Sequence, residues 1–439
     1  ETVNLAYSTT ATALAGHTIT ATDLAAAKIV ISGSDANTNN VVTLNSLNAA
    51  TTTIDASAFK GKVIATTTAT GAVTVSATGT IAQNITTGAG ADTITLSGNM
   101  GTTIQSIAGG TGNDILNVTI DNAATDFTSV SAVETINITV GANKQAGFNN
   151  GTKDDGFNAA TTVNILGGDS LSTFTVVTGA VDAAAANKTI DASTFNGSLD
   201  LAVATSGLNS FRTIKGGSST ADKVTTTVNG TVGTADKVAS MTGIETLVVN
   251  VSNDTSTNAL DLTNVTGLVT LDAQLAGGAS VINISGLAAG VNVKATSATS
   301  ADNLVIGLAS TTGTTDSLNF ELTQNGGAHV FNLDVAGIET LNLTNKATGG
   351  VASIQLDGVT ATAGSTATVN VAGTGATTLT SLSSTITVVN ASTATGALTL
   401  AAANRGSSAM TITGGEGADS IAMENTADVL TGGAGSDTL

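Results

Sequence analysis

A nine-residue pattern, G-G-x-G-x-D-x-(apolar)-x, constrains the fold of this chain more than any other feature. It is intact at 109–117 (GGTGNDILN) and at 414–422 (GGEGADSIA), and 432–439 (GGAGSDTL) begins a third copy. The glycines let the backbone adopt turn conformations that a Cβ would forbid, so that their carbonyl oxygens can converge. The aspartate adds a hard oxygen ligand of the kind that calcium prefers, and the apolar residue points into a core. The pattern predicts the calcium-binding turns of a β-roll.

The composition favours short β-strands joined by tight turns. The 439 residues include 50 Gly and no Pro, and the few aromatic residues are one Tyr and nine Phe. Val, Ile, Leu and Ala must therefore build any core, and abundant Thr and Asn fit strands whose turns are made by Gly and Asn. Ile136, Ile138 and Val140 alternate with Asn137 and Thr139, as in a strand with one buried face. We expect an all-β fold.

The charge balance limits the kinds of partner. The 32 acidic and 13 basic residues give a net charge of −19. No basic stripe exists to meet phosphates, which argues against nucleic acid. The acidity fits a protein that meets divalent cations, but it would also serve simply to keep a protein soluble. The chain has no Cys, and no apolar run approaches the roughly 18 residues of a membrane span.

A longer internal repeat accompanies the nonapeptide. Its first element is the sequence TIDAS, found at 53–57 and 189–193, its second is a glycine-containing turn that ends in aspartate, and its third is a strand led by Glu-Thr. The turn aspartates are Asp92, Asp222, Asp316 and Asp419, and the strand glutamates are Glu134, Glu245 and Glu339. The order of these elements predicts tandem β-solenoid or β-roll-like modules at 1–145, 146–255, 256–350 and 351–439, the last of which enters a C-terminal β-roll.

Two segments are predicted to depart from this pattern. The segment 141–160 is polar and rich in Gly and Asn, which favours a long surface loop or a linker between modules. The Ala-rich segment 182–187 could form a single helical turn.

The C-terminal copies form the best predicted metal site. They start 18 residues apart, and because each nonapeptide of a β-roll is half a coil, this offset stacks two loops on one side. Between them, 423–431 is a degenerate copy. Calcium needs six to eight oxygens, more than one loop can offer. The predicted ligands are Gly415, Gly417, Asp419, Asp428, Gly433, Gly435 and Asp437. The alternative is a tight Gly turn without metal.

A second calcium site is predicted upstream. The turn at 87–95 lacks only the first glycine of the pattern, and it lies 22 residues before the copy at 109–117, so the coil between them would need a four-residue bulge. Calcium shared by these loops would use Gly88, Gly90, Asp92, Gly110, Gly112 and Asp114. For Glu134, Glu245 and Glu339 two interpretations stay open. They could ligate a bridging calcium or tie modules together, or they could be solvated residues at strand entrances.

The sequence contains no catalytic constellation. The two histidines, His17 and His329, are not part of an H-E-x-x-H motif, and no G-x-S-x-G elbow has a plausible base beside it. Asp154 and Asp155 fall in the polar segment and are typical of solvated charge. We therefore expect that the protein is not an enzyme.

Taken together, the G-G-x-G-x-D turns, the IDAS elements, the G-I-E-T-L strands and the Cys-free composition rich in Thr, Ala, Gly and Val resemble a known family. The chain is similar to the repeats-in-toxin (RTX) type surface-layer (S-layer) proteins of Gram-negative bacteria such as Caulobacter and Campylobacter. The resemblance covers most of 53–439, while the first fifty residues match nothing in it.

The resemblance implies type I secretion and an extracellular location at the cell surface. It also implies several calcium ions that fold the modules outside the cell, self-assembly into a two-dimensional lattice, and a lipopolysaccharide anchor in a region outside this fragment. A type I-secreted RTX adhesin with calcium-rigidified modules is the alternative. A third option is a β-roll carrier whose enzyme lies upstream.

Overall fold

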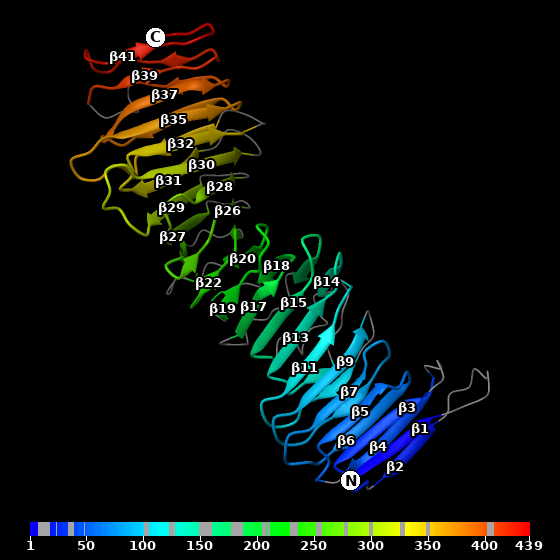
Figure 1. Cartoon of the computed structure of the whole chain (residues 1–439). Helices are drawn as coiled ribbons and strands as arrows, with labels where there is room; N and C mark the ends of the chain where they lie inside the picture. The colour runs from blue at the N-terminus through cyan, green and yellow to red at the C-terminus, as the bar shows by residue number, and fades with distance from the viewer. Residues whose placement is uncertain are drawn as a thin grey trace. The chain divides into compact units, whose positions relative to one another are not determined.

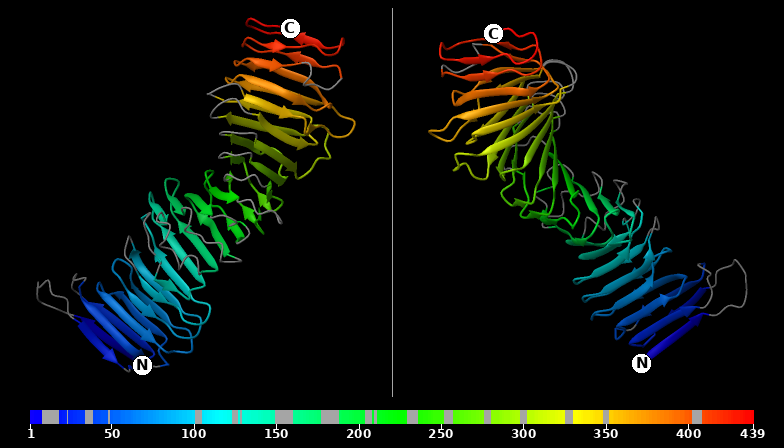
Figure 2. Two further views of the ribbon diagram at one scale, coloured as in Figure 1. Left: turned by 180° about the vertical axis from the view of Figure 1, so that it is seen from behind. Right: turned by 45° about the horizontal axis from the view of Figure 1, so that its top comes forward.

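The computed structural model contains strands and turns, and no helix in the residues it describes. The described residues are all except 8–17, 23, 34–38, 48, 101–104, 123–126, 128, 149–159, 177–187, 204–207, 209–210, 229–235, 252–256, 276–279, 298–301, 325–329, 348–351 and 402–407. The chain forms two compact units, called here the N-terminal unit (Glu1–Val224) and the C-terminal unit (Thr225–Leu439). Within each unit, parallel strands stack in sequence order (Figures 1 and 2). The predicted all-β solenoid fold is thus confirmed.

The N-terminal unit alternates between sheets, one coil at a time. Sheet N1 has the order β1 (Thr2–Tyr7), β3 (Lys28–Gly33), β5 (Thr53–Ala58), β7 (Thr74–Thr78), β9 (Thr93–Asn99), β11 (Ile115–Thr119), β13 (Thr135–Val140), β15 (Thr162–Gly167), β17 (Lys188–Phe195), β19 (Phe211–Lys215). Sheet N2 has the order β2 (Thr18–Thr22), β4 (Val41–Leu47), β6 (Lys62–Thr67), β8 (Asn84–Thr86), β10 (Ser106–Ala108), β12 (Val130–Ser131). Sheet N3 follows with β14 (Gln145–Phe148), β16 (Thr173–Val176), β18 (Ser198–Val203) and β20 (Lys223–Val228), which contains the boundary between the units.

The C-terminal unit has two long sheets of the same kind. Sheet C1 has the order β23 (Thr246–Val251), β26 (Thr270–Leu275), β28 (Asn292–Ser297), β30 (Ser317–Gln324), β32 (Thr340–Asn345), β35 (Ala367–Gly373), β37 (Ile386–Ala394), β39 (Thr411–Thr413), β41 (Val429–Thr431). Sheet C2 has the order β21 (Asp236–Lys237), β24 (Thr257–Asp261), β27 (Val281–Leu287), β29 (Asp302–Leu308), β31 (Val330–Ala336), β33 (Ala352–Leu356), β36 (Thr377–Leu382), β38 (Leu398–Leu400), β40 (Ser420–Ile421), with β34 (Val359–Thr360) also paired to β31. The short strands β22 (Met241–Thr242) and β25 (Val265–Thr266) pair with each other.

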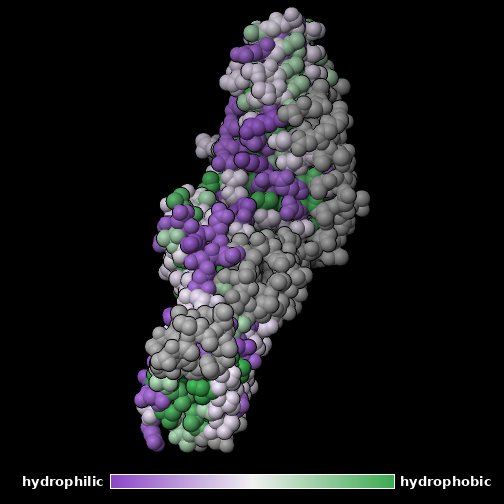
Figure 3. Space-filling model, turned by 90° about the vertical axis from the view of Figure 1, so that its right-hand side faces the viewer, coloured by the Kyte–Doolittle hydropathy of each residue, from purple (hydrophilic) through white to green (hydrophobic). Residues whose placement is uncertain are grey.

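The core lies between the sheets of each unit and is built from alternate strand residues. Ile136, Ile138 and Val140 of β13 are at most 1% exposed, which confirms the predicted alternation. Aliphatic side chains fill most of this interior, and Phe174 and Phe195 are among the few large residues that are fully buried. The residues between the inward positions face outward, and Figure 3 shows strongly hydrophilic residues gathered over the middle of the face in view.

Outward asparagines form hydrogen-bonded ladders because successive coils stack in register. In sheet N1, the Nδ2 of Asn137 donates to the Oδ1 of Asn117 at 2.8 Å, and the Nδ2 of Asn164 donates to the Oδ1 of Asn137 at 2.7 Å. These residues are direct partners in the strand register. Cross-strand pairs of this kind each add a small stabilisation.

The polar segment 141–160 differs from its prediction in one part. Gln145–Phe148 is strand β14, whose register matches Gln145 to Thr173 in β16. A Cβ at Gly147 would overlap the carbonyl oxygen of Thr175, so here a glycine lets two strands approach. The loop prediction is therefore wrong for these four residues. The glycine that suggests an irregular chain instead allows two strands to pair closely.

Two other predictions, the helical turn and the division into four modules, stay predictions. Residues 149–159 and the helical turn expected at 182–187 lie outside the described residues. The two compact units reflect contacts in space rather than sequence repeats, so the four modules stay a prediction.

Replacement of Ile138 by Ala tests the inward pattern. Loss of this fully buried side chain should lower the free energy of unfolding by about 2–5 kcal/mol. The matched variant Thr139→Ala changes the next, exposed residue of the same strand and should alter it by no more than about 0.5 kcal/mol. Urea unfolding followed by circular dichroism measures both, and equal losses would contradict the assigned faces.

Candidate metal-binding turns

The two upstream glycine turns stack directly on each other. Ala89 and Thr111 form an isolated parallel bridge, in which the amide of Thr111 donates to the carbonyl of Gly88 at 2.9 Å and the amide of Gly90 donates to the carbonyl of Thr111 at 2.8 Å. The structure therefore brings together the loops of the predicted upstream site.

The 22-residue offset between these turns is accommodated partly by a bulge in β9. The register runs from Val118↔Leu96 to Thr119↔Asn99, so the pairing passes over Ser97 and Gly98. Extra residues in one strand are the defining feature of a β-bulge, and this one lies at the strand end away from the glycine turn.

Glycine is required where the turns meet. Gly110 and Gly112 have φ values of 99° and 149°, a region that side chains with a Cβ rarely adopt. A Cβ on Gly110 would overlap the carbonyl oxygen of Gly88, and one on Gly112 would overlap that of Gly90. The close approach of these backbones brings the carbonyl oxygens of Gly88 and Gly90 against the glycines of the next turn.

Acidic side chains cap the backbone amides of successive coils. The amide of Val73 donates to Oδ1 of Asp92 at 2.7 Å, that of Asp92 donates to Oδ1 of Asp114 at 2.8 Å, and that of Asp114 donates to Oε2 of Glu134 at 2.7 Å. Asp92 and Asp114 are each only 1% exposed. We call this series the carboxylate column. Each carboxylate stands directly before a strand and hydrogen-bonds to the coil that precedes it.

The second carboxylate oxygens of Asp92 and Asp114 are left without partners. Both Oδ2 atoms are buried and have no hydrogen bond among the described residues. Burial raises the pKa of the Asp114 carboxyl, the amide of Asp92 lowers it, and the negative charges of Asp92 and Glu134 raise it further. Buried acceptors without donors are costly, and a cation would offset that cost.

The C-terminal turns repeat the arrangement with one difference. Oδ1 of Asp419 accepts from the amide of Leu398 at 2.7 Å, and Oδ1 of Asp437 accepts from the amide of Asp419 at 3.0 Å. Asp419 is 2% exposed, but its Oδ2 accepts from the amide of Gly415 at 2.7 Å. The aspartate oxygen nearest this turn therefore already has a protein donor.

The remaining predicted C-terminal ligands fall into two groups. Gly433 and Gly435 have φ values of 101° and 120°, and a Cβ on either would overlap a carbonyl oxygen of the preceding turn, at Gly415 or Gly417 respectively. Asp428 hydrogen-bonds to a different set of backbone amides from those of Asp419 and Asp437.

The oxygens of Asp428 both accept from backbone amides. Its Oδ1 accepts from Met410 at 2.9 Å, and its Oδ2 accepts from Glu424 at 3.1 Å and Asn425 at 3.0 Å. The structure thus does not hydrogen-bond Asp428 to the Asp419–Asp437 pair.

Glutamate takes the same capping position in the C-terminal unit. Oε2 of Glu339 accepts from the amide of Asp316 at 3.0 Å, and Oε1 accepts from the amide of Thr362 at 3.0 Å. Glu339 is 9% exposed, so it ties three coils together and is not a solvated residue at a strand entrance. Burial raises its pKa, but the hydrogen bonds from Thr362 and Asp316 outweigh it and leave the pKa lowered.

Glutamine performs the same capping without charge, which sequence reasoning missed. Oε1 of Gln83 accepts from the amide of Val63 at 2.6 Å, and Oε1 of Gln105 accepts from the amide of Gln83 at 2.9 Å. Capping alone therefore requires neither a carboxylate nor a metal. The shared signal is a side-chain oxygen directly before a strand, which a search for glycine motifs does not detect.

Comparison with models of known protein families gives no match, and neither does comparison with curated proteins. Within the described ranges, no set of three or more His, Cys, Asp or Glu side chains is arranged to hold a metal ion. A cation would therefore need backbone carbonyls as well as the aspartates. Nor does the described part of the chain contain a helix long and apolar enough to cross a membrane. His17, His329, Asp154 and Asp155 lie outside the described residues, and the absence of enzyme activity stays a prediction.

Gly112→Ala tests the requirement for close stacking. Strain and overlap at this turn should lower the free energy of unfolding by about 1–3 kcal/mol. Gly71→Ala is the matched control because a Cβ there meets nothing within 4 Å, and it should leave stability unchanged or raise it by up to about 1 kcal/mol. Thermal and urea unfolding compare the two. A Gly112→Ala variant as stable as the Gly71→Ala variant would contradict the stacked geometry.

Proposed function

We propose that this chain is a structural subunit of a bacterial cell-surface S-layer, which folds and assembles in a calcium-dependent way. The observation that carries the calcium part is that the buried Oδ2 atoms of Asp92 and Asp114, which directly follow the stacked glycine turns, accept no hydrogen bond from the described residues. All-oxygen surroundings suit calcium, which accepts carboxylates and carbonyls in flexible geometry. The glycine-aspartate nonapeptide is shared with RTX toxins and adhesins, and the ordered series of IDAS elements, glycine turns and Glu-Thr strands is what supports an S-layer protein in particular.

Asp92 and Asp114 would hold the ion together with carbonyl oxygens of the turns at 88–90 and 110–112. Bound calcium supplies positive charge that offsets the burial and mutual repulsion of the carboxylates. Since the stacked turns exist only in the folded chain, calcium binding adds directly to folding stability. In low calcium the same carboxylates oppose folding.

Assembly into a lattice follows from the same electrostatics. A net charge of −19 keeps separate copies apart, because like-charged molecules repel. Calcium bound at the turns would reduce that repulsion, so folding and association would both begin when the secreted chain meets extracellular calcium. The subunit acts as its own partner in this assembly.

Calcium titration of the metal-free protein tests the proposal. Circular dichroism should report a gain of β structure, light scattering should report ordered sheets, and a chelator should reverse both. Magnesium at the same concentration is the control, because its small octahedral shell fits carbonyl-rich turns poorly. Folding without growth in size would favour the RTX adhesin alternative. No response to calcium would overturn the proposal.

Asp114→Asn separates the charge of this residue from its capping role. The folded pKa of Asp114 is raised above 3.8, so its contribution to stability falls as the pH rises through the window between 3.8 and the raised folded value. With chelator at neutral pH, the neutral Asn should therefore raise the melting temperature, by about 2–4 °C if the gain is about 1 kcal/mol. With calcium, the melting temperature of the variant should rise less than that of the unchanged protein.

Asp191→Asn is the matched control for that measurement. Asp191 is an outward aspartate that pairs with Lys215 at 2.7 Å, and its pKa is lowered, although burial raises it, by hydrogen bonds from Lys215 and Ser193. Its replacement should lower the melting temperature equally with and without calcium. If Asp114→Asn behaves in the same way as this control, the calcium site is not at Asp114.

A further inference from the structure

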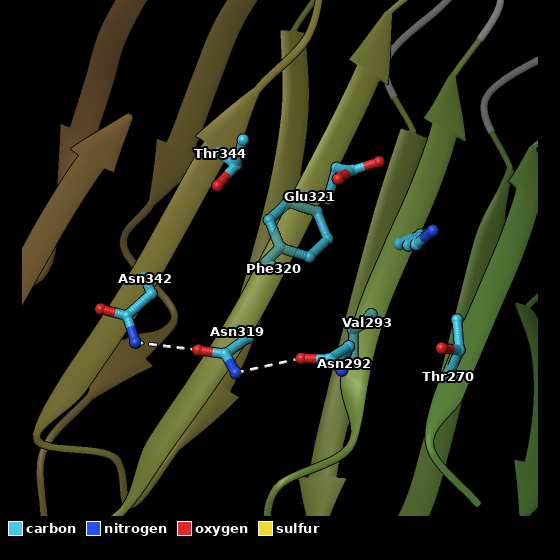
Figure 4. A pocket seen from close by; sticks show the side chains of 9 residues that line it. Thr270, Asn292, Val293, Asn319, Phe320, Glu321, Asn342 and Thr344 are labelled. Atoms are coloured by element: carbon cyan, nitrogen blue, oxygen red, sulfur yellow. Dashed lines mark hydrogen bonds between the residues drawn. The ribbon is translucent and has the colours of Figure 1, made fainter. Parts of the chain in front are cut away.

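A polar groove runs across the outer face of sheet C1. It has a volume of about 330 Å³ and crosses strands β26, β28, β30 and β32. Two rows of side chains border it (Figure 4). The first row, in strand register, is Thr270, Asn292, Asn319 and Asn342, and the second is Lys294, Glu321 and Thr344.

The first row is a ladder of carboxamides with spare hydrogen-bonding capacity. The Nδ2 of Asn342 donates to the Oδ1 of Asn319 at 2.9 Å, and the Nδ2 of Asn319 donates to the Oδ1 of Asn292 at 3.0 Å (Figure 4). A carboxamide has two N–H donors and an oxygen with two lone pairs, so Asn319 keeps one donor and one acceptor position. Asn292 and Asn319 lie on the exposed side of the sheet.

The second row is charged but balanced. Lys294 stands in register between Asp272 and Glu321, and Oε2 of Glu321 lies 2.7 Å from Nζ of Lys346. The charges of Lys294 and Glu321 in this row, and of Asp272 and Lys346 beside it, therefore sum to zero. A groove of this kind gives no net attraction to an anion or a cation, and it favours a neutral polar occupant.

The backbone of these strands is unavailable to a ligand. Strands β26 to β32 pair on both sides, with β23 at one flank and β35 at the other. An extended peptide binds to sheets mainly by adding a strand to an open edge, which this surface lacks. Recognition here must use side chains only.

We propose that this groove binds a neutral, hydroxyl-rich oligosaccharide lying along the stacking direction. Each sugar hydroxyl both donates and accepts, which matches the one donor and one acceptor that Asn319 and Asn342 each keep free on successive coils. Four strands span about 14 Å at the strand spacing of about 4.8 Å, and the two rows lie about 7 Å apart, two residues along a strand. Val293 and Phe320, between the two rows, are buried, and the ring of Phe320 packs on Phe331 of sheet C2 with centroids 5.7 Å apart, so a sugar would meet the side chains of the two polar rows.

The test is titration of the full chain, in calcium, with three trisaccharides. Maltotriose and triacetylchitotriose are the neutral probes, and trigalacturonate is the acidic one. Saturation-transfer NMR and calorimetry should detect a neutral probe at concentrations up to about 10 mM, which reveals even a Kd of about 1 mM. No binding of either neutral probe would overturn the proposal, and so would tighter binding of trigalacturonate.

Two ladder variants locate the site. Asn319→Ala should weaken binding of the neutral probe about tenfold, since it removes the central pair of free hydrogen-bonding positions. Asn137→Ala removes the equivalent rung of the N1 ladder, which lies in the other unit, and should leave binding unchanged. Thermal unfolding of both variants measures how far the loss of the asparagine hydrogen bonds lowers stability. Equal effects of the two variants on binding would overturn the assignment to this groove.

This proposal is independent of calcium-driven assembly. A protein that forms sheets but ignores sugars would retain the S-layer proposal and lose this one. A protein that binds sugars without assembling would retain the oligosaccharide proposal and lose the S-layer proposal.

Discussion

The hydrogen bond from a backbone amide to a side-chain oxygen of the next coil fixes how the coils of this protein stack. Asp92, Asp114 and Glu134 form such bonds in succession, and each stands directly before a strand. The amide at that position would otherwise be buried without a partner, at a cost of about 1–3 kcal/mol. The same bond helps to set the register of the strand that follows, because it holds the residue directly before that strand against the neighbouring coil. Packing and surface ladders both depend on that register.

A carboxylate at this position carries a cost that a carboxamide does not. Gln83 and Gln105 cap amides without charge, whereas burial raises the pKa of Asp114 and of Asp222. Both aspartates therefore reduce stability as the pH rises above the ordinary aspartate range. An uncharged residue would suffice for capping, so the choice of aspartate beside glycine turns needs a separate reason. For Asp92 and Asp114, a cation at the unpartnered oxygens is the reason that we propose.

The sequence predicts more of the fold than of the site. Alternating residues such as Ile136 and Ile138 identify inward faces, because a period of two is a direct consequence of strand geometry. Glycine turns mark Asp92 and Asp114, but no motif marks Gln83, whose role depends on which coil lies beneath it. The strand at Gln145–Phe148 escapes detection for a related reason. Its glycine is needed for a close approach to a neighbour that lies 28 residues further along the chain.

Stacking in register turns every repeated position into a column, and this restricts which residues a column can contain. Like charges directly opposite each other are destabilising, whereas asparagines pair with each other at no such cost. The outer face accordingly has asparagine ladders, and its charged column alternates in sign through Asp272, Lys294 and Glu321. The like-charged series of Asp92, Asp114 and Glu134 breaks this rule only where backbone amides meet the carboxylates. The amides account for one oxygen of each aspartate, and the second oxygen is where added positive charge would have its greatest effect.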